Sequence, residues 1–156
     1  MITKEEIIQR LNLLPHPEGG YFHQSYVSDK TMDDHHLFTS IYFLIESGNI
    51  SHSHRIASDE LWYYHAGDAI TIHMIHPDHR YEQVKLGMDL AAGEVPQFLV
   101  PARTIFASTV DDDAQWSFVG CMVAPGFSFD DFELFKKADL LPIYPEHEAV
   151  ISQYAL

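Results

Sequence analysis

Short apolar runs separated by turn residues fill the chain from Tyr21 to Ala124 and constrain its fold more than any other feature. The runs are rich in β-branched and aromatic residues, and no long helical period interrupts them. Such spacing is typical of an antiparallel sandwich or barrel. The runs predict strands over residues 21–28, 38–45, 50–54, 60–65, 70–76, 84–86, 97–100, 104–110 and 115–124.

Helix signals occur only at the two ends of the chain. Thr3 is followed by Glu6, the spacing of a capping box, and an apolar stripe comes directly after it. Prolines and glycines over 15–20 end this helix, while Pro145 opens a second one that runs to Leu156. We expect a loop over 29–36, a turn over 77–82, and a single domain spanning residues 1–156.

Charge and cysteine content narrow the classes of partner and compartment. Nine Lys and Arg residues stand against 23 Asp and Glu residues, a formal net charge of −14. Such a surface repels phosphate, so neither nucleic acid nor an anionic membrane is an expected partner. The single cysteine, Cys121, cannot form an internal disulfide, and the first residues show no signal-peptide pattern. We therefore expect a cytoplasmic protein.

The most informative stretch runs from Gly48 to Gly67. His52 and His54 are two positions apart, which on a regular strand directs both imidazoles to one face. Glu60 follows after a short turn, and the neighbouring Asp59 is the alternative carboxylate. Two histidines and a carboxylate are a common way to build a transition-metal site in a barrel.

The same stretch resembles the first motif of the cupin superfamily. The second cupin motif has a counterpart over 93–106, where Pro101 matches the pattern. Arg103 stands there in place of the usual glycine, and Phe106 occupies the position of the last histidine ligand. A phenyl ring cannot bind a metal, so the resemblance implies a site with at least one ligand missing.

Longer motifs make the chain similar to the cupin-5 family of small cupins. They comprise residues 13–22, Thr39-Ser-Ile-Tyr42, His54-Arg55, Ser58-Asp-Glu-Leu-Trp62, Gln97, Val100-Pro101, 119–127 and 129–134. The resemblance implies a mainly β protein: a single cupin double-stranded β-helix barrel, or jelly roll, with short N- and C-terminal helices. It also implies a homodimer, and it brings no established substrate.

The first functional hypothesis is a metal-independent pocket that binds a small molecule. The pocket would epimerise or isomerise a sugar or sugar nucleotide, and no cofactor would be needed. His54 is its candidate base, Glu60 or Asp59 orients that base, and Tyr42 is a candidate acid. The other candidate ligand-binding residues are aromatic or polar and lie on the predicted strands or in the 15–20 loop: Glu18, Tyr21, Asp59, Trp62, Tyr64, Gln97 and Phe106.

Two alternatives use the same location. One is a metal-dependent oxygenase or isomerase in which His52, His54 and Glu60 bind a divalent Fe, Mn, Ni or Zn ion. The other is a non-catalytic protein that binds its ligand without transferring a proton. Stoichiometric metal would distinguish the first alternative, and ligand binding without turnover would distinguish the second.

Overall fold

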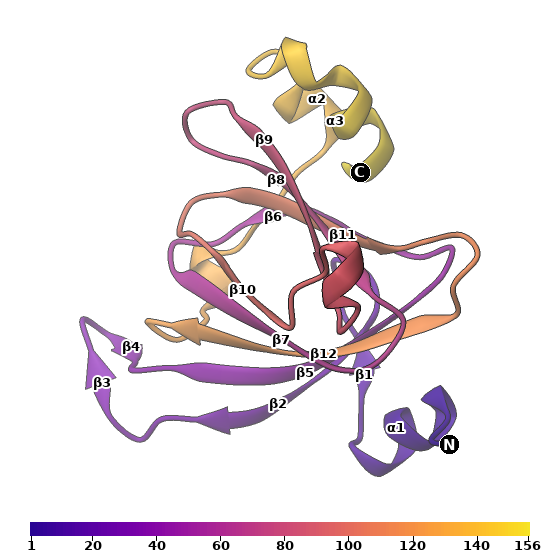
Figure 1. Cartoon of the computed structure of the whole chain (residues 1–156). Helices are drawn as coiled ribbons and strands as arrows, with labels where there is room; N and C mark the ends of the chain where they lie inside the picture. The colour runs from indigo at the N-terminus through magenta and orange to yellow at the C-terminus, as the bar shows by residue number, and fades with distance from the viewer.

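The computed structural model describes all 156 residues as two facing antiparallel sheets in a jelly roll, with a helical segment at each end (Figure 1). The larger sheet has the order β1 (Leu14–Pro15), β2 (Tyr21–Val27), β5 (Thr39–Glu46), β12 (Trp116–Ala124), β7 (Asp59–Gly67), β10 (Gln97–Val100). The smaller sheet has the order β13 (Glu133–Leu134), β6 (Ile50–Arg55), β11 (Ile105–Val110), β8 (Ile70–Ile75), β9 (Tyr81–Leu86). The mainly β fold predicted from the sequence is thus confirmed.

Three short α-helices lie outside the sheets. Helix α1 (Lys4–Arg10) begins with the predicted capping box between Thr3 and Glu6, and its buried Ile7 packs on the outer face of the larger sheet. Helices α2 (Lys137–Leu140) and α3 (Glu148–Tyr154) pack at the opposite end, beside the smaller sheet (Figure 1). None of the helices is long and apolar enough to cross a membrane.

The remaining elements refine the sequence-based expectations. The predicted loop over 29–36 contains a small hairpin of β3 (Thr31–Met32) and β4 (His35–His36), and the predicted turn over 77–82 already includes the start of β9. The C-terminal helix begins later than expected, because 3₁₀ turn η3 (Pro145–His147) precedes α3. Two further 3₁₀ turns are η1 (Leu90–Ala92) and η2 (Phe129–Asp131).

The main core lies between the two sheets. Inward side chains of β5, β7, β8, β11 and β12 form one buried cluster that includes Phe43, Trp62, Ile72, Phe106 and Val119. Every residue of β8 is buried, because one face of this strand meets the core and the other is covered by the C-terminal helices. The core fills part of the barrel and leaves an interior cavity beside it.

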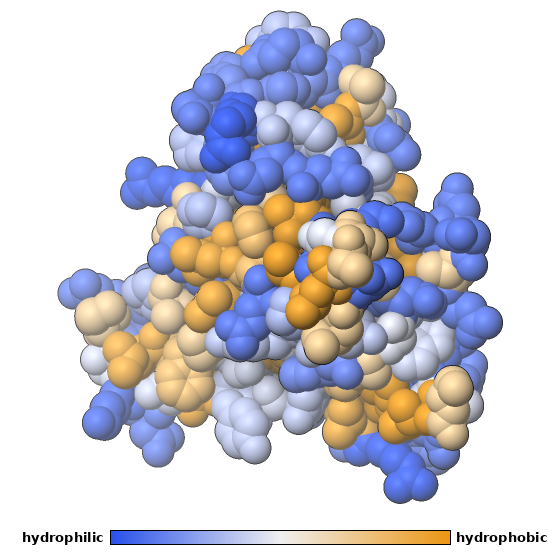
Figure 2. Space-filling view, viewed as in Figure 1, coloured by the Kyte–Doolittle hydropathy of each residue, from blue (hydrophilic) through white to orange (hydrophobic).

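The surface is mostly hydrophilic, as the acidic composition requires. Figure 2 shows one group of apolar side chains near the middle of this face, over η1 and β10. Met88, Leu90 and Leu99 are exposed there, and β10 is an edge strand whose only neighbour is β7. The surface therefore carries a mostly apolar strip, with Asp89 between Met88 and Leu90, beside an open sheet edge.

Candidate functional site

A cavity of about 180 Å³ opens between the two sheets. Strands β2, β5, β6, β7 and β12 contribute to its wall, together with the loop before β2 and the segment around η2. The wall is mostly apolar, with a small group of ionisable residues among phenyl and aliphatic side chains. The lining residues are His16, Glu18, Phe22, Gln24, Thr39, Ile41, His54, Ile56, Glu60, Cys121, Val123, Phe127, Phe129 and Phe132.

The loop over 15–20 folds inward and places Glu18 in the cavity wall. The backbone N–H groups of Gly19 and His16 donate to the carbonyls of His16 and Gly20, which closes the turn. Gly19 and Gly20 both have positive φ angles, a conformation that glycine adopts without strain. The backbone of His52 then donates to the Glu18 carbonyl over 2.7 Å, so the loop is fastened to β6.

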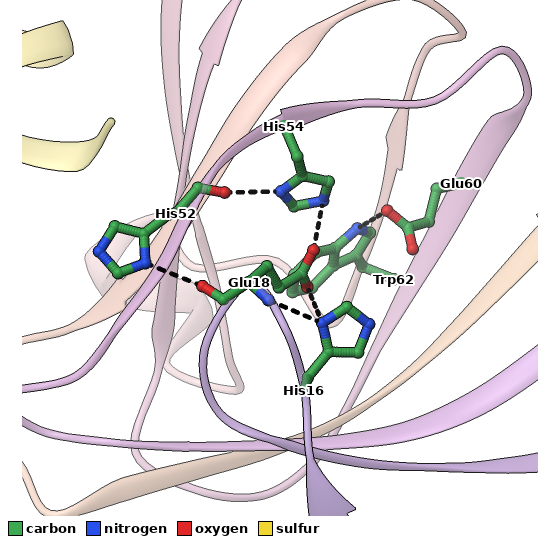
Figure 3. Close-up of polar contacts among 6 residues, drawn as sticks. All are labelled: His16, Glu18, His52, His54, Glu60 and Trp62. Atoms are coloured by element: carbon green, nitrogen blue, oxygen red, sulfur yellow. Dashed lines mark hydrogen bonds and ion pairs between the residues drawn. The ribbon is translucent and has the colours of Figure 1, made fainter. Parts of the chain in front are cut away.

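Glu18 and His54 form a buried ion pair (Figure 3). The Nε2 atom of His54 lies 3.0 Å from a Glu18 carboxylate oxygen, and its Nδ1–H donates to the His52 carbonyl over 2.7 Å. Both ring nitrogens therefore face oxygen atoms, and a ring with two protons donates to both when Glu18 is ionised, as the lowered pKa of Glu18 and the raised pKa of His54 favour. His54 is thus an imidazolium and Glu18 is a carboxylate.

The pKa shifts of this pair follow from its geometry. Burial alone would lower the pKa of His54, but the charge of Glu18 and two hydrogen bonds raise it above its ordinary value. Burial alone would raise the pKa of Glu18, but the neighbouring imidazolium holds it below its ordinary value. Each group is therefore stabilised in its charged form by the other.

His16 supplies a neutral imidazole to the same cavity. Its Nδ1 accepts the backbone N–H of Glu18 over 3.1 Å, so a neutral ring carries its proton on Nε2. Burial lowers the pKa of His16 below its ordinary value, which keeps the ring neutral at pH 7. The Nε2–H of His16 is consequently a hydrogen-bond donor for a ligand.

Glu60 is the second buried carboxyl of the cavity, and it has no cationic partner. Strand alternation along β7 turns Glu60 inward, where it is 8% exposed. The indole N–H of Trp62 donates to one of its oxygens over 3.2 Å, and the other oxygen has no protein donor (Figure 3). Burial raises the pKa of Glu60 to about 7, since the charge of His54, which acts to lower it, is opposed by the charge of Glu18.

The structure separates His52 from His54, although their spacing predicted one shared face. A β-bulge between β6 and β11 inserts an extra residue in β6 between Ser51 and His54, so the alternation of side chains is broken. The His52 Nδ1–H donates to the backbone carbonyl of Glu18 over 2.9 Å, and the ring points away from the Glu18 carboxylate (Figure 3). His52 is therefore not part of the cavity wall.

The residues present do not fit the predicted metal site. No group of three His, Cys, Asp or Glu side chains is arranged to hold a metal ion. His52 is directed elsewhere, and both nitrogens of His54 are engaged as donors. The Phe106 ring fills the adjacent space, with its centroid 4.2 Å from that of His54. The set of His52, His54 and Glu60 is thus not brought together as a ligand shell.

Several other predicted site residues lie outside the cavity. Asp59 accepts the backbone N–H of Ala102 on the surface, which leaves Glu60 as the inward carboxylate. Tyr21 and Tyr42 pack with α1 on the outer face of the larger sheet, because their strand neighbours Phe22 and Ile41 face inward.

The last four residues predicted for ligand binding also lie outside the cavity. Trp62 and Phe106 belong to the main core, where Trp62 still holds Glu60 by its indole N–H. The hydroxyl of Tyr64 donates to the carbonyl of Gly67 over 2.6 Å, and Gln97 is exposed on edge strand β10. None of the four is part of the cavity wall.

Sequence reasoning missed most of the apolar lining. Phe22, Ile41 and Val123 face inward from their strands. Alternation predicts that inward direction, but it does not tell whether such a residue lines a cavity or packs in the core. Phe127, Phe129 and Phe132 come from the segment around η2, whose irregular backbone carries no periodic signal. The only hint was that these residues belong to motifs of the resembled family, over 13–22, 39–42, 119–127 and 129–134.

The two facing sheets and the interior cavity define a cupin-type barrel. The family comparison agrees, since residues 5–135 match the profile of the cupin superfamily (DUF985). The chain belongs to this family.

Similar proteins cover almost the whole chain. A protein from Shewanella oneidensis, SO0799, is 48% identical with a TM-score of 0.94, covering 100% of this chain and 99% of its own. A hypothetical protein from Leishmania major is 42% identical with a TM-score of 0.95, covering 99% of each chain. The uncharacterized protein YML079W of Saccharomyces cerevisiae is 25% identical over 169 residues, covering 95% of this chain and 84% of that protein.

Proposed function

We propose that the cavity binds a small molecule and that Glu60 transfers a proton on it, in an isomerase- or epimerase-like reaction. The observation that carries this proposal is the state of Glu60, a buried carboxyl with one free oxygen in the cavity and a pKa of about 7. A general base is most effective when its pKa lies near the working pH. Glu60 therefore replaces His54 as the candidate base.

The other ionisable groups support the same reaction in different roles. His54 cannot accept a proton, because both of its nitrogens already carry one. Burial raises the pKa of the Cys121 thiol well above its ordinary value, so this residue is a poor nucleophile. His16 offers a neutral N–H donor, which is suited to stabilising an oxygen that gains negative charge.

The proposed step balances without a redox partner. The Glu60 carboxylate takes a proton from a carbon next to a carbonyl group, and the electron pair moves to the carbonyl oxygen. The His16 Nε2–H stabilises the resulting enolate oxygen. If Glu60 returns the proton to the neighbouring carbon while the hydroxyl proton moves to the other oxygen, the product is the isomer. If a water molecule protonates the opposite face of the enolate and Glu60 releases its proton to the resulting hydroxide, the product is the epimer.

The size of the cavity limits the ligand. An engineered cavity of roughly 150 Å³ accommodates benzene, so about 180 Å³ holds a single ring or a compact chain. A sugar nucleotide is too large to lie inside. We therefore narrow the expected substrate to a small carbonyl compound of at most monosaccharide size.

Hydrogen exchange in D₂O tests this function. Small aldoses, ketoses and 2-oxo acids are incubated with the protein, and loss of the proton next to the carbonyl is followed by ¹H NMR. We expect exchange with the wild type and at least about 100-fold slower exchange with Glu60→Gln. Asp59→Asn, a neighbouring carboxylate on the outside of the strand, is the matched control and should exchange normally. Binding of these compounds without exchange would instead support the non-catalytic alternative.

We also propose that the chain forms a homodimer through the strip of Met88, Leu90 and Leu99. This strip lies beside edge strand β10, and its three named side chains are apolar in a chain of net charge −14, with one exposed acid, Asp89, between Met88 and Leu90. Two copies of so acidic a chain repel each other elsewhere, so a mostly apolar face favours contact between them. A second copy would also cover the open sheet edge.

A further inference from the structure

We propose that the ligand of the cavity is a small organic ammonium compound, with its cationic nitrogen beside Glu60 and its apolar part against the phenyl rings. This inference rests on the proposed function only in placing the ligand in this cavity. It concerns the charge of that ligand, and for an ammonium ligand Glu60 is the counter-ion rather than the proton-transferring group.

Charges inside the cavity wall are not balanced when both carboxyl groups are ionised. The wall holds two carboxyl groups, Glu18 and Glu60, but only one imidazolium, His54. The charge of His54 is already matched by Glu18 at 3.0 Å. His16 is neutral, and the lining contains no lysine or arginine. The charge of His54 also acts on Glu60, but no ion pair joins the two, and one imidazolium cannot neutralise two carboxylates.

The unpaired carboxyl of Glu60 is buried and accepts only one hydrogen bond from the protein. Glu60 is 8% exposed, and only the Trp62 indole donates to it, through one of its two oxygens. A buried carboxylate without a cation of its own is unfavourable, so in the free protein the group holds a proton below about pH 7. An ammonium group at the second oxygen can replace that proton and form a charge-assisted hydrogen bond.

Phenyl rings form much of the remaining cavity wall. Phe127, Phe129 and Phe132 form a cluster with ring centroids 4.9–5.9 Å apart, and Phe132 also lies 5.5 Å from the His54 ring. Phenyl faces attract cations within about 6 Å and pack well against apolar groups.

The experiment compares three ligands of one shape and different charge. Benzylammonium, benzyl alcohol and benzoate are titrated into the full-length protein at pH 6 and pH 8 by isothermal calorimetry. We expect benzylammonium to bind at least tenfold more tightly than benzyl alcohol at pH 8, and benzoate to bind least. Because the ammonium must displace the proton of Glu60, its affinity should fall about tenfold at pH 6, while that of the alcohol changes little.

Two variants assign the effect to Glu60. Glu60→Gln keeps the shape of the side chain and should remove both the preference for ammonium and its pH dependence. Asp130→Asn removes the same charge from an exposed position beside the cavity and should preserve both. Circular dichroism of each variant confirms that it is folded.

The outcomes separate this inference from the proposed function. If the alcohol binds as tightly as the ammonium at pH 8, the inferred ligand class is wrong, while the cavity remains a binding site for neutral carbonyl compounds. If none of the three ligands binds, the cavity does not accept one-ring ligands and this inference falls. In that case the D₂O exchange experiment alone tests the proposed function.

Discussion

At the scale of single residues, a carboxyl buried in an apolar cavity must either hold a proton or find a cation. Glu60 is in this position, and its pKa is raised to about 7 from an ordinary 4.5. The folded state therefore binds this proton more tightly than the unfolded chain does. Stability is consequently lost as the pH rises from about 4.5 through 7, and the loss is complete above that pH.

Glu60→Gln should therefore stabilise the protein at high pH. The amide cannot ionise, so the variant avoids the cost of charging the buried group, which amounts to about 3 kcal/mol above pH 7. At pH 4.5 the two proteins should differ little. Urea unfolding at both pH values measures the difference, and equal stability at pH 8 would show that Glu60 ionises there without cost.

The ionisable residues of the site were only partly predictable. Glu60 and His54 were identified because they lie in a recognisable motif, and Glu18 because it lies in a distinctive Pro-Gly loop. The state of His54 was not predictable, because it depends on a carboxylate that comes from 36 positions earlier in the chain. His54 was expected as a neutral base, and its geometry makes it the charged partner of Glu18.

At the scale of elements, the loop over 15–20 determines whether Glu18 reaches His54. Gly19 has φ +116°, and a Cβ at this position would lie 2.0 Å from the carbonyl oxygen of Ile50 on β6. No side chain fits there unless the loop moves away from the strand. The loop and β6 therefore form one structural unit that holds the ion pair.

Gly19→Ala should displace the loop and break the pair between Glu18 and His54. We expect a destabilisation of about 3 kcal/mol or more, because the broken pair leaves an uncompensated buried charge. Gly48→Ala is the matched control, since Gly48 also has a positive φ but has no atom near its would-be Cβ. It should cost only about 1 kcal/mol in backbone strain. Thermal unfolding of both variants compares the two costs, and equal costs would contradict the docking of the loop.

Strand β6 shows where sequence spacing fails at this scale. The spacing of His52 and His54 correctly placed them on one strand but could not reveal the bulge opposite β11. A bulge depends on the register between two strands, which a single sequence does not encode locally. The predicted three-ligand metal site failed for this reason.

At the scale of the whole molecule, the jelly roll was predictable from alternating strands, turn residues and the family motifs. The strand over 97–100 was predicted with its observed bounds, while the small elements β3, β4, β13 and η1 were missed. Those elements are two to three residues long, too short for any periodic pattern. A pocket inside the barrel was predicted, but its phenyl wall was not. The phenyl rings come from irregular backbone around η2, which only the folded chain brings to the barrel.

The proposed homodimer is the prediction that belongs to this scale. Light scattering of the wild type should give about twice the subunit mass of 17.9 kDa. A Leu90→Glu and Leu99→Glu double variant should be monomeric, because it brings like charges together in the contact. Tyr26→Glu, at an exposed position on β2 of the same sheet, is the control and should remain dimeric. A monomeric wild type would contradict the proposal.

The central claim is that Glu60 is the ionisable group poised for function inside the barrel. A pH titration by NMR of protein labelled with ¹³C at the glutamate carboxyls tests it most directly. We predict one carboxyl resonance that titrates near pH 7 and is absent from Glu60→Gln, while the Glu18 resonance titrates below the ordinary range. A Glu60 resonance that titrates near pH 4.5 would contradict the account.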